Sequence, residues 1–168
     1  VLRLLRHRQP PVQRRRSYEP QGGYVLFQEF LPDNAFDTRI TVIGNRAFGF
    51  RRFNRPNDFR ASGSGLLDYA ADAVDPEFVR LGFLTARLLG AQSAAIDGLC
   101  RGNQPIVGEV SYTYVSSAVH ACSGHWELDG DPESGDLRWV DGQIWPEEAQ
   151  IEDFIPLVRS AWARKRDS

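Results

Sequence analysis

Alternating hydrophobic and polar positions mark the first ordered part of the chain. Residues 37–44 (DTRITVIG) alternate as in a half-buried strand, and Gly44-Asn45 is suited to a hairpin turn into a second strand over 46–52. The run 24–31 is also rich in β-forming residues, and residues 32–34 turn the chain after it. Three consecutive strands with short connections predict an antiparallel sheet.

A helix is predicted over residues 75–90, after a polar stretch at 53–65 that is long enough to be functional. Asp75 is a good N-cap, Pro76 occupies the first helical position, and Gly90 ends the pattern. Helical spacing predicts that the helix buries a single stripe of side chains. This stripe consists of Phe78, Leu81, Thr85 and Leu88.

Two further strands and a second helix complete the predicted elements. The strands cover 92–99 and 105–112, around a turn at 101–104. The second helix opens at Pro146, and Pro156 is expected to kink it or to delay its start. Its stripe consists of Ile151, Phe154 or Ile155, Val158 and Trp162. Together these elements predict an α+β fold with a mostly antiparallel sheet backed by helices.

The composition is that of an ordinary globular chain, with 168 residues for about one domain. No apolar run approaches the roughly 20 residues that span a membrane, and Arg3 and Arg6 do not fit a signal peptide. Two cysteines cannot form a disulfide scaffold, so we expect a cytoplasmic protein. Because the chain contains no methionine, we expect Val1 to be an internal position of a longer protein.

The net charge of −2 conceals a basic N-terminus. The first 18 residues hold six arginines and no acid, which leaves a balance of −8 for the rest. Such an arm can attract nucleic acid or an acidic membrane surface. No aromatic side chain lies between the arginines to stack on bases, and the remainder is acidic. We therefore favour a solvated connector and expect neither nucleic acid nor a membrane as partner.

Two acids are predicted to face each other on the last pair of strands. If the turn is centred on Asn103, Asp97 lies directly opposite Glu109, where like charges need to be neutralised. Ser111 shares the face of Glu109 because strand side chains alternate. Two carboxylates and a hydroxyl are hard ligands that suit Mg²⁺. The alternative is a different register with one carboxylate in solvent, which the apolar neighbours disfavour.

Arginines gather near a loop of glycine and serine, Ser62-Gly63-Ser64-Gly65. Glycine lets backbone N–H groups approach phosphate oxygens, and arginine offers bidentate contacts. Surface arginines and a flexible linker would explain each feature separately. Beside a magnesium site, the combination is typical of phosphoryl transfer. The arginines are Arg39, Arg51, Arg52 and Arg60.

Four motifs resemble, in family order, the C-terminal half of an ATP-grasp domain in the neighbourhood of the RimK-like amino-acid ligases. The resemblance covers residues 24–112, just over half of the chain. The motifs are a hinge strand at 25–31 (VLFQEFL), a "DxR…VIG" segment at 37–44, an "FR" loop at 58–62 (DFRAS), and a "VD…EVN" pair at 95–97 (AID) and 108–111 (GEVS).

The resemblance implies an ATP-dependent carboxylate–amine or carboxylate–thiol ligase that forms an acylphosphate intermediate, with ATP and Mg²⁺ as cofactors. Its substrates would be a small-molecule or peptide carboxylate and an amine acceptor. The residues implied for the nucleotide are Glu29, Phe30 and Leu31 at adenine, Asp33 at the ribose, and Arg52 at the phosphates. The implied catalytic residues are Arg60, beside the reacting phosphate, and Arg39, nearer the acceptor. The implied Mg²⁺ ligands are Asp97, Glu109 and Ser111.

Departures from the family pattern keep a second hypothesis open. Ser111 stands where the family has asparagine, and the chain lacks the phosphate-binding lysines and glycine-rich flap of the N-terminal subdomain. We therefore expect an incomplete domain that does not complete a catalytic cycle unaided. The alternative is a non-catalytic ATP-grasp-like protein that serves in binding or as a scaffold.

The expected organisation is a basic arm or connector at 1–23, an ATP-grasp C-terminal subdomain at 24–125, and an acidic, aromatic tail at 126–168 ending in a helix. In the tail region, His120, Cys122 and His125 have a spacing compatible with metal ligands. No fourth ligand is evident, so packing or a wall of the substrate site is the favoured explanation. Self-association is compatible with the sequence.

Overall fold

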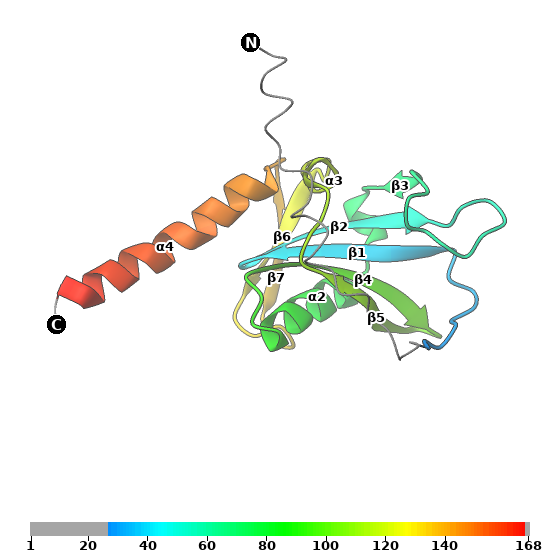
Figure 1. The fold of residues 1–168 in the computed structure, drawn as a ribbon, viewed down its shortest axis with the longest axis horizontal. Helices are drawn as coiled ribbons and strands as arrows, with labels where there is room; N and C mark the ends of the chain where they lie inside the picture. The colour runs from blue at the N-terminus through cyan, green and yellow to red at the C-terminus, as the bar shows by residue number, and fades with distance from the viewer. Residues whose placement is uncertain (1–26, 167–168) are drawn as a thin grey trace, which may run out of the picture. The chain divides into compact units, whose positions relative to one another are not determined.

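The computed structural model describes residues 27–166, with side chains through Arg164, and the chain divides after Phe30 into two units. The described strands are β1 (Phe36–Ile43), β2 (Arg46–Phe53), β3 (Leu67–Asp68), β4 (Ser93–Arg101), β5 (Gln104–Ser111), β6 (Gly124–Asp129) and β7 (Asp136–Asp141). They form one seven-stranded sheet in the order β5-β4-β1-β2-β6-β7, with β3 on β2 (Figure 1). All these strand pairs are antiparallel, which confirms the α+β class.

The helices are α2 (Pro76–Leu88), α3 (Ser116–His120) and α4 (Pro146–Arg166), with a 3₁₀ turn η2 (Ala71–Ala73). The predicted capping of α2 is confirmed, because the Asp75 carboxylate accepts a hydrogen bond from the Glu77 N–H at 2.9 Å and Gly90 has φ 62°. Helix α4 begins at Pro146 as predicted and continues through Pro156, so its start is not delayed.

The buried stripe predicted for α2 was wrong except at Phe78. The buried residues are Phe78, Val79, Gly82, Phe83 and Ala86, whereas Leu88 is 77% exposed. Both stripes have helical spacing, and the packing against the sheet decides between them. A Cβ on Gly82 would lie 2.7 Å from Ile40 Cγ2, so a glycine is required where the helix approaches β1 most closely.

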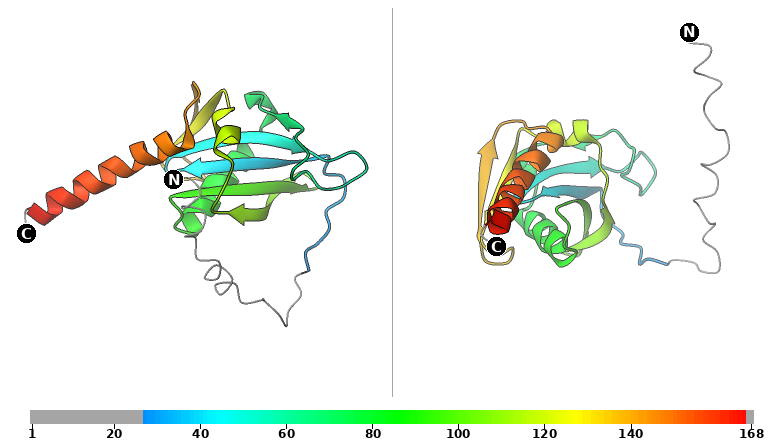
Figure 2. Two further views of the ribbon diagram at one scale, coloured as in Figure 1. Left: turned by 45° about the horizontal axis from the view of Figure 1, so that its top comes forward. Right: turned by 60° about the vertical axis from the view of Figure 1, so that its left-hand side comes forward.

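Two apolar clusters cover the two faces of the sheet. On one face, Ile40 and Val42 of β1 pack against Phe78 and Phe83 of α2. On the other face, Phe48 and Phe50 of β2 pack with Val119 of α3, Cys122 and Ala149 of α4. Because strand side chains alternate, Asp37 and Arg39 of β1 lie on this second face as well. Figure 2 shows α3 and the start of α4 on one side of the sheet and α2 on the other.

The β4–β5 hairpin brings Asp97 opposite Glu109, as the sequence predicted. The turn differs from the predicted one, since Arg101 pairs with Gln104 across a two-residue turn. That turn alone would shift the register by one residue. A bulge between Asp97 and Gly98 restores the pairing, so the prediction is correct for a reason that it did not include.

The strand predicted at 24–31 was wrong for residues 27–31, which have no regular secondary structure; residues 24–26 lie outside the described part. High β-propensity produces a strand only where a neighbouring strand is available for pairing. Of the described helices, none has both the length and the apolar character that crossing a membrane requires.

Candidate functional site

A charged cluster lies on the second face of the sheet, the face that packs against α3 and the start of α4. Arg39 of β1 is the direct strand neighbour of Asp97 on β4, and Asp37 is the direct neighbour of Arg52 on β2. The DxR spacing places Asp37 and Arg39 on one face, because residues two apart in a strand point the same way. We call Asp37, Arg39, Arg52 and Asp97 the four-residue ion cluster.

Three ion pairs connect the four-residue ion cluster. Arg39 binds Asp97 through two hydrogen bonds, Nε–Oδ1 at 2.6 Å and Nη2–Oδ2 at 2.7 Å. Arg52 binds Asp37 in the same bidentate way, at 2.7 and 2.6 Å, and its Nη2 also donates to Asp97 Oδ2 at 2.7 Å. Both carboxylate oxygens of Asp97 therefore accept arginine hydrogen bonds, and Arg52 bridges the two acids.

Burial sets the electrostatics of this cluster. Burial raises the pKa of Asp37 above its ordinary value of 3.8, and the guanidinium of Arg52 opposes this shift. For Arg52, burial works against the charge, but the hydrogen bonds and charges of Asp37 and Asp97 prevail and raise its pKa. The side chains of Arg52 and Asp97 are only 9% and 11% exposed, so water screens their interaction weakly.

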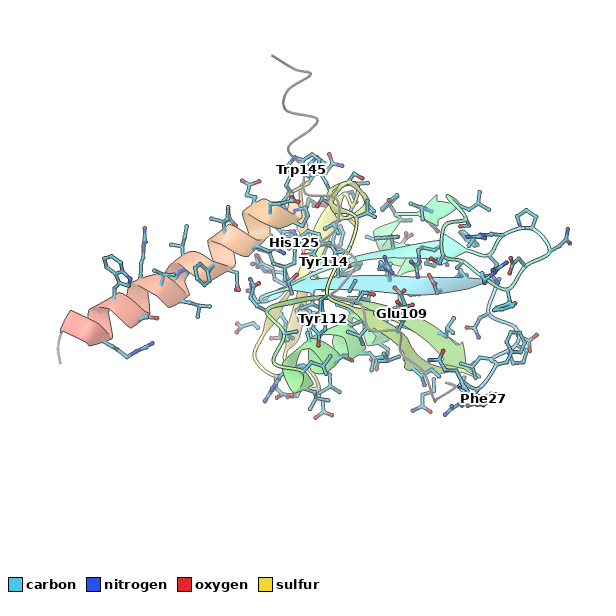
Figure 3. All side chains as sticks on the ribbon, in the orientation of Figure 1. Phe27, Glu109, Tyr112, Tyr114, His125 and Trp145 are labelled. Carbon is cyan, nitrogen blue, oxygen red and sulfur yellow. The ribbon has the colours of Figure 1, made fainter. Side chains whose placement is uncertain are left out.

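Glu109 adds one further carboxylate at the edge of the cluster. It faces Asp97 across the hairpin and is exposed, and Figure 3 labels its side chain. Ser111 Oγ donates a hydrogen bond to Glu109 Oε1 at 3.2 Å. The two predicted carboxylates and the predicted hydroxyl thus lie on one face of adjacent strands. The four paired residues carry no net charge together, so Glu109 makes this group net negative.

A cavity of about 420 Å³ adjoins the ion cluster, and we call it the sheet cavity. Its residues include Arg39 and Arg52 from the sheet, Ser62 to Gly65 from the loop, and Tyr69. Gly63 and Gly65 have φ angles of 71° and 73°, which glycine adopts without strain. The predicted combination of arginines with the glycine–serine loop is therefore present, in a cavity of the size that small ligands occupy. The remaining lining is Phe50, Ala61, Leu67, Val115, Ser117 and Ala118.

The other predicted arginines lie elsewhere. Arg60 is outside the lining of the sheet cavity, and its exposed side chain binds Asp58 at 2.6 Å. Hydrogen bonds from Arg60 lower the pKa of Asp58 to about 2. Arg51 pairs with Asp68 and stacks over Phe36 and Phe53, on the other face from Arg52. Of the four arginines named from the sequence, Arg39 and Arg52 are thus the two that line this cavity.

Of the residues predicted to contact adenine and ribose, Leu31 and Asp33 do not line the sheet cavity. Glu29 and Phe30 lie in coil at the end of the first unit, and Leu31 begins the second. Asp33 has φ 67° and lines a different cavity of about 150 Å³, beside Phe78 on the α2 face. Their roles at a nucleotide remain predictions.

His120, Cys122 and His125 do not gather into a possible metal site in the described part of the chain. Burial raises the pKa of the Cys122 thiol to about 12, and the thiol lies 3.7 Å from the Gly49 carbonyl oxygen. His120 stacks on Trp145 at 3.9 Å between ring centroids, whereas His125 packs against Phe48. Figure 3 labels Trp145 and His125. Packing, one of the two explanations favoured from the sequence, describes all three.

Magnesium binding at the paired acids Asp97 and Glu109 stays a prediction. Within residues 27–166, no three histidine, cysteine or acidic side chains gather into a possible metal site. Mg²⁺ needs fewer protein ligands, because it keeps waters and is held by one or two carboxylates plus substrate phosphates. Asp97 and Glu109 supply such a pair. Incoming phosphate would compete with Asp97 for the N–H groups of Arg39 and Arg52.

Sequence reasoning missed the aromatic and helical parts of the cavity lining. Phe50 lies two residues from Arg52 on β2, so strand alternation alone could have placed it on the same face. Tyr69, which packs against Phe50 with ring centroids 5.1 Å apart, follows the loop and carried no such signal. Nothing in the sequence indicated that α3, through Ser117 and Ala118, would line the cavity either.

Neither the family models nor the curated proteins compared with the chain match it. The resemblance to ATP-grasp enzymes therefore rests on the four sequence motifs and stays a prediction.

Proposed function

We propose that the chain is the C-terminal part of an ATP-grasp ligase and that the sheet cavity receives the phosphates of ATP with Mg²⁺. The observation that carries this proposal is the direct pairing of Asp97 with Glu109 on the sheet face that bears Arg39 and Arg52. Cationic and acidic groups of these types, side by side, are what a metal–phosphate complex requires.

The chain's own residues have distinct roles in this proposal. Arg39 and Arg52 bind phosphate oxygens, and the backbone of Ser62 to Gly65, which lines the same cavity, donates further hydrogen bonds. Glu109, with Asp97 and Ser111, holds Mg²⁺, which neutralises phosphate charge when it is bound. Arg60 lies on an exposed loop next to the cavity-lining residue Ala61, and its role at the reacting phosphate requires it to leave Asp58.

The proposed reaction follows the family to which the motifs are similar. A substrate carboxylate oxygen attacks the γ-phosphorus of ATP, the bond to the β–γ bridging oxygen breaks, and ADP leaves. An amine or thiol then attacks the acyl carbon of the acylphosphate. Inorganic phosphate leaves with the bonding electrons, and the nucleophile loses its proton. Positive groups on the phosphate oxygens favour both steps because negative charge moves onto the departing groups.

A non-catalytic binding protein is the second candidate, and one observation favours it. Both oxygens of Asp97 are already engaged by arginines, and the cluster is neutral without a ligand. Such a cluster can be retained for stability after catalysis is lost. In this case the cavity still accepts an anion, but magnesium does not strengthen its binding.

The first prediction is that ATP binding depends on Mg²⁺, which distinguishes the ligase from the non-catalytic protein. Equilibrium dialysis of the whole chain with radiolabelled ATP measures affinity with and without Mg²⁺. We expect Mg²⁺ to strengthen binding and Glu109→Gln to weaken it about tenfold in the presence of Mg²⁺. Glu109 is exposed, so this variant should fold normally.

The matched control is Glu133→Gln, which changes an exposed glutamate between β6 and β7 and should leave ATP affinity unchanged. Binding that ignores both Mg²⁺ and Glu109 would favour the non-catalytic candidate. Absence of ATP binding under all conditions would contradict both candidates.

A further inference from the structure

The apolar stripe of α4 lies in solvent. Ile151, Phe154 and Trp162 are 61%, 59% and 73% exposed, and Ile155 is 41% exposed. Figures 1 and 2 show α4, in orange to red, extending beyond the sheet with its C-terminal half away from the other described elements. A helix of 21 residues is about 30 Å long, so this is an extended apolar surface.

Beyond its first turn, where Glu147 accepts a hydrogen bond from Ser116 of α3, α4 contacts the rest of the fold through a different side of the helix. Ala149 is fully buried in the cluster with Phe48 and Phe50, and Asp153 accepts a hydrogen bond from Gln92 at 2.9 Å. At 100° per residue, Ala149 and Asp153 are close to each other around the helix and more than 120° from the centre of the apolar stripe. The stripe is therefore available while the helix stays docked.

The spacing of the stripe is that of a coiled-coil seam. Positions 151, 155, 158 and 162 are separated by four, three and four residues, which is the alternation of a heptad. The next seam position on the N-terminal side is Glu148, and the next on the C-terminal side is Lys165. Pro156 is off the seam, so its missing N–H does not interrupt the apolar contact surface.

We propose that α4 pairs with α4 of a second copy of this chain as an antiparallel two-helix coiled coil. With the crossing centred between residues 156 and 157, Ile155 opposes Val158 of the second copy, and Ile151 opposes Trp162. The same alignment places Glu148 opposite Lys165 at each end of the apolar seam. A parallel pair would instead bring glutamate against glutamate and lysine against lysine.

The charge distribution along α4 favours a second copy of the same helix in antiparallel orientation. The four acidic residues of the helix lie between 147 and 153, and its four basic residues lie between 159 and 166. This arrangement also complements the helix dipole, so by itself it would not require a partner. The exposed apolar seam, which runs from the acidic half into the basic half, is what favours a partner. A two-fold symmetric pair covers both seams with identical surfaces.

Sedimentation equilibrium of the whole chain tests the pairing. We expect the weight-average mass to rise with concentration from 19.0 kDa toward that of a dimer. Ile155→Glu should weaken association at least tenfold, because it places a charge in the seam of both helices. Leu157→Glu is the control, since Leu157 is 56% exposed but off the seam. Circular dichroism checks that both variants fold.

Charge reversal tests the antiparallel alignment. Glu148→Lys and Lys165→Glu should each weaken association about threefold to tenfold, and the double variant should restore it. A chain that stays at 19.0 kDa up to about 1 mM overturns the proposal. So does a dimer that tolerates Ile155→Glu, or one in which the double reversal fails to restore association. If α4 serves a different protein partner, the isolated chain stays monomeric, which is the first of these results.

Discussion

Asp97 is the residue that holds the charged face of the sheet together. It accepts hydrogen bonds from two arginines, and it connects β4 to β1 and β2 through them. Its side chain is 11% exposed, so its loss would leave two guanidiniums in a weakly screened environment. Asp97 therefore supports the fold even before any ligand binds.

Asp97→Asn should lower the free energy of unfolding by about 3 kcal/mol, because removal of one partner leaves a buried charge uncompensated. Urea denaturation of the purified variant measures this loss. Asp72→Asn, at an exposed position on η2, is the control and should stay within about 0.5 kcal/mol of the parent chain. If the two variants were equally stable, the arginine pairs would contribute nothing to the fold.

Single residues also show how far the sequence could predict the site. The assumed turn at Asn103 placed Asp97 opposite Glu109, but this pairing holds only because a bulge offsets the shorter turn that the hairpin adopts. The ion pairs on Asp97 could not be predicted, because they depend on β1 lying between β2 and β4 in the sheet. Strand order is a long-range property that no local pattern in this chain specifies.

Among the elements, the hairpins and capped helices were predictable and their packing was not. Gly44-Asn45 and Asp75-Pro76 are local signals, and both turn and helix occur where they predict. The β6–β7 hairpin was missed, because its strands are short and its sequence is acidic and aromatic rather than alternating. Trp126 nonetheless enters the core beneath α2, where it packs against Trp139 with ring centroids 4.6 Å apart.

The packing of β6 and β2 against α4 creates a buried histidine. Both ring nitrogens of His125 are buried without hydrogen-bond partners, and Nε2 lies 3.6 Å from Glu127 Oε1. Burial lowers the pKa of His125 below its ordinary value of 6.5, and Arg46 on β2 acts in the same direction. Glu127 on β6 and Glu152 on α4 oppose the shift. The neutral imidazole is therefore the form that the fold favours.

Acidification should weaken the fold through His125. As pH falls through 6.5, the unfolded chain gains a proton that the folded chain resists, so the free energy of unfolding decreases. The contribution of one proton is at most about 1.4 kcal/mol per pH unit. We expect His125→Phe to flatten the decline between about pH 7.5 and 5.5, as measured by thermal melts at each pH. An unchanged slope in the variant would contradict this assignment.

At the scale of the whole molecule, the two faces of the sheet differ in composition and in what covers them. One face is closed by α2 and supplies most of the apolar core. Among the described elements, α3 and the start of α4 close one end of the other face, which also carries the ion cluster and the sheet cavity. The proposed function requires that this second face bind a nucleotide together with a metal ion.

Paramagnetic mapping tests that claim most directly. Mn²⁺, added with ATP to the ¹⁵N-labelled chain, broadens the amide signals of residues close to the ion. We expect selective broadening of the amide signals around Asp97, Glu109 and Ser111 and along Ser62 to Gly65. The broadening should be much weaker when ATP is omitted. Broadening centred on the acidic turn of α4 at Glu147 and Glu148, or none near Glu109, would contradict the proposed function.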